Sequence, residues 1–301
     1  MNNNGRHGPD LTPEERIAFL ESLLENSAPW TDNGLIFIQF LDDNDPQVRA
    51  LAIRGLWYYP EPALIDRLIE MAEQDPSPLV RARAVSGLGI YMYEGEMADY
   101  GYDFGPMTEI LREEDLPQAD FVRAKEFLQS VYADVTRSLD ERRFALEALS
   151  FLSDPEVADL VEEAYNQPER EMKISAVFAM GRSGLMRWTD ILGRELYNDD
   201  WEIQREAIRA VGEMGLDELG KDLSRLTYAD EREIMLEALA ALAQTGWEGA
   251  FDRIDELTLD TDQEIAQAAE EAMDEWILMN ELQSLGDEPE LDLDWDEENQ
   301  E

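Results

Sequence analysis

Residues 142–149 read RRFALEAL, and closely similar stretches follow as KISAVFAM at 173–180 and QREAIRAV at 204–211. Each stretch contains an alanine at the same place, and this alanine returns every 31 residues, at Ala145, Ala176, Ala207, Ala238 and Ala269. Apolar residues stand mostly four positions before it and one and four positions after it, which is the spacing of one face of an α-helix. A fixed period of this length indicates a repeat protein.

Two earlier copies of the same stretch lie near the N-terminus, VRALAIRGL around Ala52 and VRARAVSGL around Ala84. The distance from Ala84 to Ala145 is 61 residues, so one unit between them is missing or remodelled. The start of the helix that carries the alanine is also marked. Seven positions before each alanine, five of the seven residues are good N-cap types: Asp45, Ser77, Ser138, Asp200 and Asp262.

The repeated alanine has a physical reason, because two closely packed helices need a small residue at their crossing. No single helix pair can bury its apolar face alone, whereas stacked pairs can. We therefore predict an all-α, right-handed solenoid of about seven helix pairs over residues 12–284. It begins with a lead-in helix at 12–25 and has an insertion at 93–106. Residues 1–11 and the acidic tail 285–301 are expected to be disordered.

These stretches resemble the HEAT repeat, in the short form found in phycobilisome-lyase-like proteins. The resemblance is carried by DPQVRALAIRGL at 45–56 and SPLVRARAVSGLG at 77–89, and then by the later alanine helices, covering about residues 31–280. It implies the solenoid fold. Its functional implication is broad, because the family includes adaptors, lyases and a few enzymes.

The charge balance restricts the partners. The chain has 70 Asp and Glu against 24 Lys and Arg, a net charge of −46. Such a chain repels the phosphates of nucleic acids and anionic membranes, so we expect neither as a partner. No apolar run is long enough to span a bilayer, and the first residues lack the layout of a signal peptide. The expected location is the cytoplasm.

Catalytic chemistry has few candidate residues. The chain has no cysteine and a single histidine, His7. This excludes thiolate metal sites and cysteine nucleophiles, and it argues against most zinc-dependent and Ser-His-Asp hydrolases. We therefore expect no enzymatic activity, no catalytic residue, no metal site and no cofactor.

The predicted binding residues are aromatic. The segment 91–107, YMYEGEMADYGYDFGPM, breaks the 31-residue period, and insertions in repeat proteins often form the binding face. Trp201 stands one residue after a helix cap, where other units have polar residues, which predicts an exposed ring. The predicted partner-binding residues are therefore Tyr91, Tyr93, Tyr100, Tyr102, Phe104 and Trp201. Trp57, Tyr58 and Tyr59 could extend this aromatic surface, although Trp57 is also a candidate for covering the end of the core.

A ladder of basic residues stands three positions before the alanine, at Arg49, Arg81, Arg142 and Lys173. It could bind an anion. We favour a structural role, in which these cations bond to acids in neighbouring turns, with Asp43, Asp75 and Asp140 as the expected partners.

Three functions remain open. The leading one is a monomeric, non-catalytic scaffold or adaptor whose acidic surface and aromatic loop bind a protein partner with a basic or aromatic-rich segment. The resemblance to phycobilisome-lyase-type repeats allows a bilin lyase or chaperone. The charge allows an acidic mimic of nucleic acid, which would occupy the basic groove of a DNA-binding protein.

Overall fold

The computed structural model describes residues 11–26, 33–99 and 116–286. Every regular element in these residues is a helix, and none of them forms a strand. The chain divides into two compact units, residues 1–185 and 186–301, which are considered separately below. Nearly all of the predicted N-terminal and C-terminal disordered segments lies outside the described residues.

The N-terminal unit opens with the predicted lead-in helix. Helix α1 (Pro13–Asn26) begins with a capping box, in which Thr12 N donates to Glu15 Oε2 at 2.8 Å and Glu15 N donates to Thr12 Oγ1 at 3.3 Å. Four helix pairs follow: α2 (Gly34–Gln39) with α3 (Pro46–Gly55), α4 (Leu64–Gln74) with α5 (Pro78–Gly87), α8 (Gln118–Ala133) with α9 (Leu139–Leu149), and α10 (Pro155–Tyr165) with α11 (Arg170–Arg182). A 3₁₀ turn, Leu56–Tyr58, ends the first pair.

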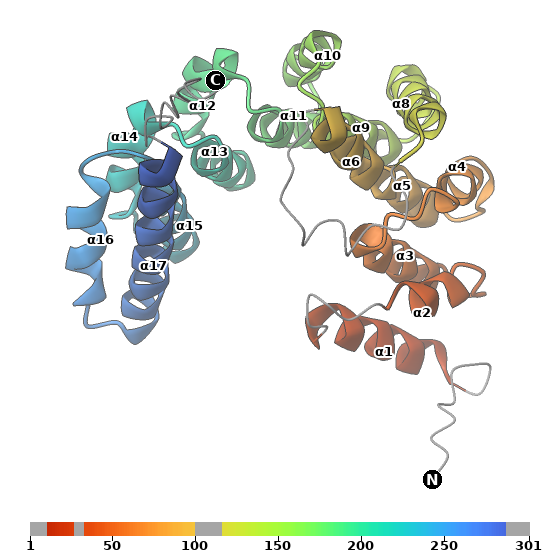
Figure 1. The fold of residues 1–301 in the computed structure, drawn as a ribbon, viewed down its shortest axis with the longest axis horizontal. Helices are drawn as coiled ribbons and strands as arrows, with labels where there is room; N and C mark the ends of the chain where they lie inside the picture. The colour runs from red at the N-terminus through yellow and green to blue at the C-terminus, as the bar shows by residue number, and fades with distance from the viewer. Residues whose placement is uncertain (1–10, 27–32, 100–115, 287–301) are drawn as a thin grey trace, which may run out of the picture. The chain divides into compact units, whose positions relative to one another are not determined.

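The second helices of these pairs form one layer. Helices α3, α5, α9 and α11 stack in order, and α4, α8 and α10 lie on one side of them (Figure 1). An additional helix, α6 (Gly89–Asp99), packs against α8 and α9. It occupies the place where the 31-residue period breaks. The side of this layer that faces away from the first helices is called the open face below.

The C-terminal unit contains three further pairs: α12 (Thr189–Glu195) with α13 (Trp201–Glu213), α14 (Gly220–Leu226) with α15 (Arg232–Gln244), and α16 (Ala250–Thr258) with α17 (Gln263–Gly286). Helices α13, α15 and α17 stack as the second helices do in the other unit. The described residues thus contain seven pairs, which confirms the predicted all-α solenoid of HEAT-like helix pairs.

The repeat position is the centre of the packing. All seven alanines of the period have no solvent exposure: Ala52, Ala84, Ala145, Ala176, Ala207, Ala238 and Ala269. Four of the five predicted cap residues accept hydrogen bonds from the first turn of their helices, and Ser77 does not: Asp45, Ser138, Asp200 and Asp262. Gly184 and Gly215 stand two residues after the last residues of α11 and α13, and φ is +60° at both, a conformation that glycine adopts without strain.

The basic ladder ties neighbouring turns together in the N-terminal unit. Arg49 donates from Nε and from a terminal nitrogen to the two carboxylate oxygens of Asp75, each at 2.8 Å. Arg81 Nε donates to Glu141 Oε1 at 3.0 Å, and its terminal nitrogen donates to the carbonyl of Asp75 at 3.0 Å. The predicted structural role of these two arginines is confirmed.

Other members of the ladder differ from the prediction. Asp43 pairs with Arg16 of the lead-in helix at 2.8 Å. Asp140, a predicted partner, instead pairs with Arg143 on its own helix at 2.8 Å, and the neighbouring Glu141 takes the inter-repeat position. Arg142 Nε donates to the carbonyl of Tyr132 at 3.0 Å. The ammonium of Lys173 lies 4.9 Å from the ring centre of Tyr165.

Glu141 gives the fold a dependence on pH. Burial opposes ionisation of this carboxyl, but hydrogen bonds from Ser138 and Arg81 outweigh burial and lower its pKa below the ordinary 4.5. A lowered pKa in the folded state stabilises the fold above the unfolded-state pKa, and this contribution is lost as the pH falls through the folded-state value.

We therefore expect Glu141→Gln to lower the free energy of unfolding by about 1.5–3 kcal/mol at pH 7, because charge-assisted hydrogen bonds are lost. The difference from the parent chain should be constant above about pH 5.5 and should shrink below about pH 4.5, as measured by urea unfolding across that range. Asp140→Asn is the matched control on the same helix, since Asp140 is exposed. A difference that stayed constant down to pH 3 would contradict this role for Glu141.

Candidate functional site

Helices α3 and α5 differ from the rest of the chain in charge. Residues 46–55, PQVRALAIRG, and residues 78–87, PLVRARAVSG, together contain four arginines and no acidic residue. In a chain with a net charge of −46 this is a local concentration of positive charge. The two helices pack side by side, so the four arginines belong to one region of the N-terminal unit.

These four arginines fall into two kinds. Arg49 and Arg81 reach into the turns and meet carboxylates there. Arg54 and Arg83 form no hydrogen bond or ion pair with any part of the chain that the structure describes. The guanidinium of Arg83 lies 5.8 Å from the ring centre of Phe144 on α9. Positive charge is thus left without an acidic partner on these two helices.

The pKa of Arg83 also reflects the positive charge around it. It is lowered from the ordinary value, first by burial and then by the positive charge of Arg54, while Glu147 opposes the shift and Arg143 adds to it. An incoming negative group would relieve this repulsion. The site therefore favours an anion on electrostatic grounds.

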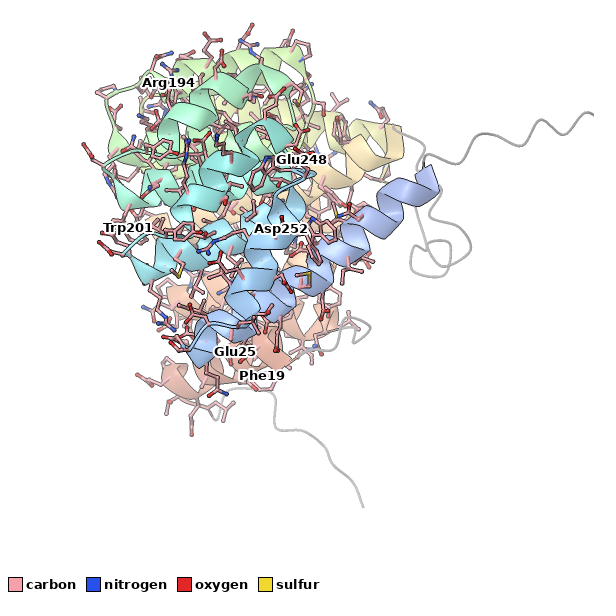
Figure 2. All side chains as sticks on the ribbon, turned by 90° about the vertical axis from the view of Figure 1, so that its left-hand side faces the viewer. Phe19, Glu25, Arg194, Trp201, Glu248 and Asp252 are labelled. Carbon is pink, nitrogen blue, oxygen red and sulfur yellow. The ribbon has the colours of Figure 1, made fainter. Side chains whose placement is uncertain are left out.

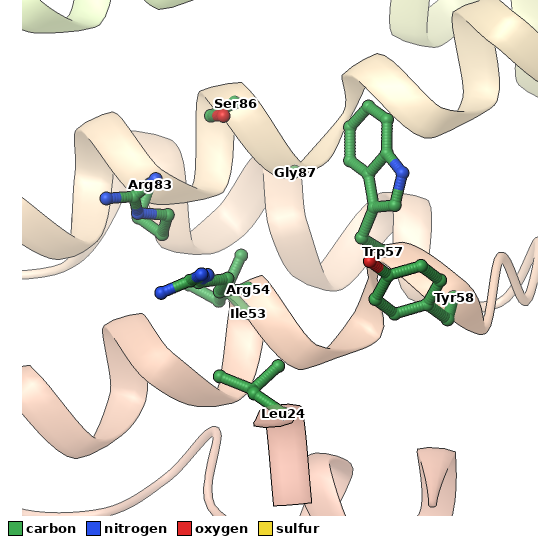
Figure 3. Close-up of a pocket in the computed structure, with 8 residues that line it drawn as sticks. All are labelled: Leu24, Ile53, Arg54, Trp57, Tyr58, Arg83, Ser86 and Gly87. Atoms are coloured by element: carbon green, nitrogen blue, oxygen red, sulfur yellow. The ribbon is translucent and has the colours of Figure 1, made fainter. Parts of the chain in front are cut away.

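Arg54 and Arg83 line a pocket of about 240 Å³ at the packed helices α3 and α5. Its other walls come from the end of α1, from α3 with its following turn, and from α5: Leu24, Ile53, Trp57, Tyr58, Ser86 and Gly87. Figure 3 shows the two guanidinium groups at one end of the pocket and the rings of Trp57 and Tyr58 at the other. The pocket thus combines a cationic end with an aromatic end.

Glycine at position 87 keeps α5 close to α3. A Cβ added there would lie 2.9 Å from Cγ2 of Ile53, which is closer than real Cβ contacts. The same glycine leaves its part of the wall without a side chain. The close helix crossing and the open pocket therefore depend on one residue.

Aromatic side chains continue from the pocket toward α6 and α9. The Trp57 ring lies 5.5 Å from the ring of Phe151, and Tyr93 meets the same ring edge-on at 6.0 Å. Tyr58 is 74% exposed. An exposed aromatic group beside unpaired arginines has the composition of a protein contact surface, where Tyr, Trp and Arg are enriched.

The structure corrects one predicted site residue. Tyr91 is only 2% exposed, and its hydroxyl donates to the carbonyl of Glu61 at 2.8 Å. It is a core residue rather than a partner contact, because residues 91–99 continue as helix α6 instead of forming a loop. The part of the predicted 93–106 insertion that is described, residues 93–99, is therefore helical. The other part, with Tyr100, Tyr102 and Phe104, lies outside the described residues.

Two predicted residues have exposed rings. Tyr93 is 41% exposed and belongs to the aromatic group around Phe151. Trp201 is 48% exposed, and the guanidinium of Arg205 lies 4.9 Å from its ring centre. Trp201 belongs to the C-terminal unit and stands at its margin in Figure 2. Exposure agrees with the prediction for both, while their binding role stays a prediction.

The candidate pair Arg54 and Arg83 is not among the predicted site residues. The signal that could have identified it is the absence of acids from the two arginine-containing helices. Among the described residues, no cluster of three or more His, Cys, Asp or Glu side chains could hold a metal ion. The described helices also include none with the length and apolar character that crossing a bilayer requires.

Comparisons with known proteins agree with the helix pairs. A family model described as HEAT repeats matches residues 35–99 and 189–274, half of the chain, with one match in each unit. No curated protein sequence matches the chain.

A search of solved structures also finds matches. YibA of Escherichia coli is 12% identical, with 89% of this chain and 99% of that chain covered and a TM-score of 0.48. The complex of CpcE and CpcF of phycocyanin lyase from Nostoc is 19% identical, with 92% and 99% covered and a TM-score of 0.47. An engineered protein is 18% identical, with 87% and 71% covered and a TM-score of 0.40. From the matched repeats and the buried 31-residue period, we conclude that the chain belongs to the HEAT-repeat family.

Proposed function

We propose that this protein is a non-catalytic adaptor that binds a segment of a partner protein along the open face of α3 and α5. The observation that carries the proposal is the exposed Tyr58 beside a pocket lined by Trp57 and two unpaired arginines. Interface hot spots are enriched in these three residue types, and one such side chain often contributes 2 kcal/mol or more.

Packing supports an interaction role for this face. Tyr58 is the last residue of the 3₁₀ turn that follows α3. Because its ring is largely exposed, it contributes little to the stacking of α3 on α5. A solvent-exposed ring that contributes little to the core is a candidate for contact with another molecule. Membership in a repeat family fits this role, because stacked pairs present extended surfaces.

The two units differ in the charge that they offer a partner. The predicted acidic surface does not describe α3 and α5, which together contain four arginines and no acidic residue. In the C-terminal unit, α17 has six acidic residues and no basic one over Gln263–Gly286. The predicted basic partner segment therefore fits the C-terminal unit, and the pocket of the N-terminal unit calls for a different chemistry.

Site-specific cross-linking tests the adaptor proposal. A photoreactive phenylalanine analogue placed at position 58 should capture a protein partner in cells when illuminated. The matched control is the same analogue at position 135, since Val135 is 77% exposed in the turn between α8 and α9 and lies away from the pocket residues. The proposal fails if position 58 yields no adduct, or only those that position 135 also yields.

A further inference from the structure

We propose that the pocket between α3 and α5 recognises a carboxylate: an Asp or Glu side chain of a partner peptide bonds to Arg54 and Arg83, and an adjacent apolar side chain packs on Trp57. This inference rests on the adaptor function proposed above and assigns the chemistry of the partner. It reverses the predicted basic partner for this unit.

The first argument is the state of the two arginines. The neighbouring arginines on the same helices, Arg49 and Arg81, each reach a carboxylate within 3.0 Å. Arg54 and Arg83 reach none within the described residues, although the sequence has 70 acids. An arginine that faces a pocket without an acid leaves its planar donor groups open, and these groups match a carboxylate in a bidentate geometry.

The second argument is the shape of the pocket. The cationic groups occupy one end and the aromatic rings the other, with Leu24 and Ile53 as apolar walls (Figure 3). A bare inorganic anion would use only the cationic end. A peptide with an acidic residue next to an apolar one would use both, and it would bury the apolar side chain against Trp57.

The third argument separates a peptide from larger polyanions. A nucleic acid or an anionic membrane brings many charges toward a chain with a net charge of −46. A short peptide brings only a few, and at physiological salt the Debye length of about 8 Å screens distant carboxylates more than those in direct contact. The favourable contact with two arginines then outweighs the repulsion from the remainder of the surface.

A peptide titration tests the assignment on the full-length chain. The probe is Gly-Ser-Glu-Leu-Glu-Ser-Gly with blocked ends, compared with matched peptides in which both Glu are replaced by Gln or by Lys. Binding is followed by the NMR signals of the arginine side-chain Nε–H groups, which report on Arg54 and Arg83 directly. The Glu peptide should shift both signals with a saturable response, and the Gln and Lys peptides should not.

Two variants establish which groups bind. Arg54→Gln and Arg83→Gln should each weaken binding of the Glu peptide about tenfold or more, since each removes a charge-assisted pair. Arg225→Gln is the matched control, because it removes the same charge from an exposed arginine on α14 in the other unit. Arg54 is exposed, so Arg54→Gln is expected to fold normally. This variant keeps the test valid even if Arg83→Gln fails to fold.

The outcomes separate this inference from the adaptor proposal. If the Glu peptide leaves both arginine signals unshifted up to millimolar concentration, or if the Gln peptide binds equally, the carboxylate assignment is overturned. Cross-linking at position 58 can still succeed in that case.

The chain's own sequence LDLDWDE at 291–297 also places acidic residues next to apolar ones. A gain of more than about tenfold in peptide affinity when Asp292, Asp294 and Asp296 are changed to Asn would mean that this segment competes for the pocket, and would overturn assignment to a partner.

Discussion

Replacing Arg49 with alanine should lower the free energy of unfolding by about 3–5 kcal/mol, the usual effect of breaking a buried ion pair by removing one partner. Arg49 is 9% exposed, and its guanidinium donates to both oxygens of Asp75 at 2.8 Å. It also donates to the carbonyl of Asp43 at 2.7 Å. Removing it leaves the Asp75 carboxylate, which is 8% exposed, and the carbonyl of Asp43 without that donor. Urea unfolding monitored by circular dichroism measures the loss.

Arg67→Ala is the control for this prediction. Arg67 also joins neighbouring repeats, through Asp42, but that carboxylate is 81% exposed. Exposed ion pairs contribute about 0–1 kcal/mol. We therefore expect a change at least threefold smaller than that of Arg49→Ala. Equal effects of the two variants would show that burial of the Arg49–Asp75 pair has no bearing on stability.

The second large effect is expected for Gly212→Leu on α13. A Cβ at this position would lie 2.8 Å from Cα of Ala241 and 2.9 Å from its Cβ, on the neighbouring helix α15. The Cα of Ala241 is a backbone atom, so a side-chain rotation cannot relieve this clash. Overpacking of this kind costs about 3 kcal/mol, the upper end of the common range. Thermal unfolding should show a lower melting temperature.

Ala240→Leu provides the comparison for this substitution. Ala240 lies on α15 next to Ala241 but is exposed, so the added carbons extend into solvent. Its melting temperature should stay within a degree or two of the parent chain, because surface substitutions away from packing usually change stability by less than about 0.5 kcal/mol. An unchanged melting temperature for Gly212→Leu as well would mean that α13 and α15 are farther apart than the structure has them.

The fold was predictable because the same sequence pattern recurs in several repeats. The alanines of the 31-residue period are all buried, and most of the predicted caps bond to their helices. Each repeated position tests the register of the others, so a single misleading residue has little effect. The prediction was wrong where the period breaks: residues 91–99 contain enough apolar and helix-compatible residues to continue as a helix, which buries Tyr91.

The candidate site was harder to predict because it depends on which arginines lack partners. The sequence places Arg81 in the ladder, where it reaches Glu141, but it does not show that Arg83 two positions later reaches no acid in the described part of the chain. The difference arises because two residues on a helix differ in direction by about 200°. The partner of Arg81 also comes from 60 residues away. Only the packing of α9 against α5 brings that carboxylate within reach.

The arginine ladder also determines how a local disturbance spreads along the chain. In the N-terminal unit, Arg49 and Arg81 of the ladder each reach an acid of the next repeat, and Arg16 of the lead-in helix reaches Asp43. Opening one repeat therefore exposes a charge that its neighbour had neutralised. Openings there are expected to involve several repeats at once. In the C-terminal unit the ladder positions hold Gln204, Met235 and Ala266. Its repeats are joined elsewhere, as by Arg232, which donates to both carboxylate oxygens of Asp262 in a pair that is 41% exposed on each side. Exposed ion pairs stabilise less than buried ones, so the ion pairs of that unit couple its repeats more weakly. Its local openings are therefore expected to involve fewer repeats at once than those of the N-terminal unit.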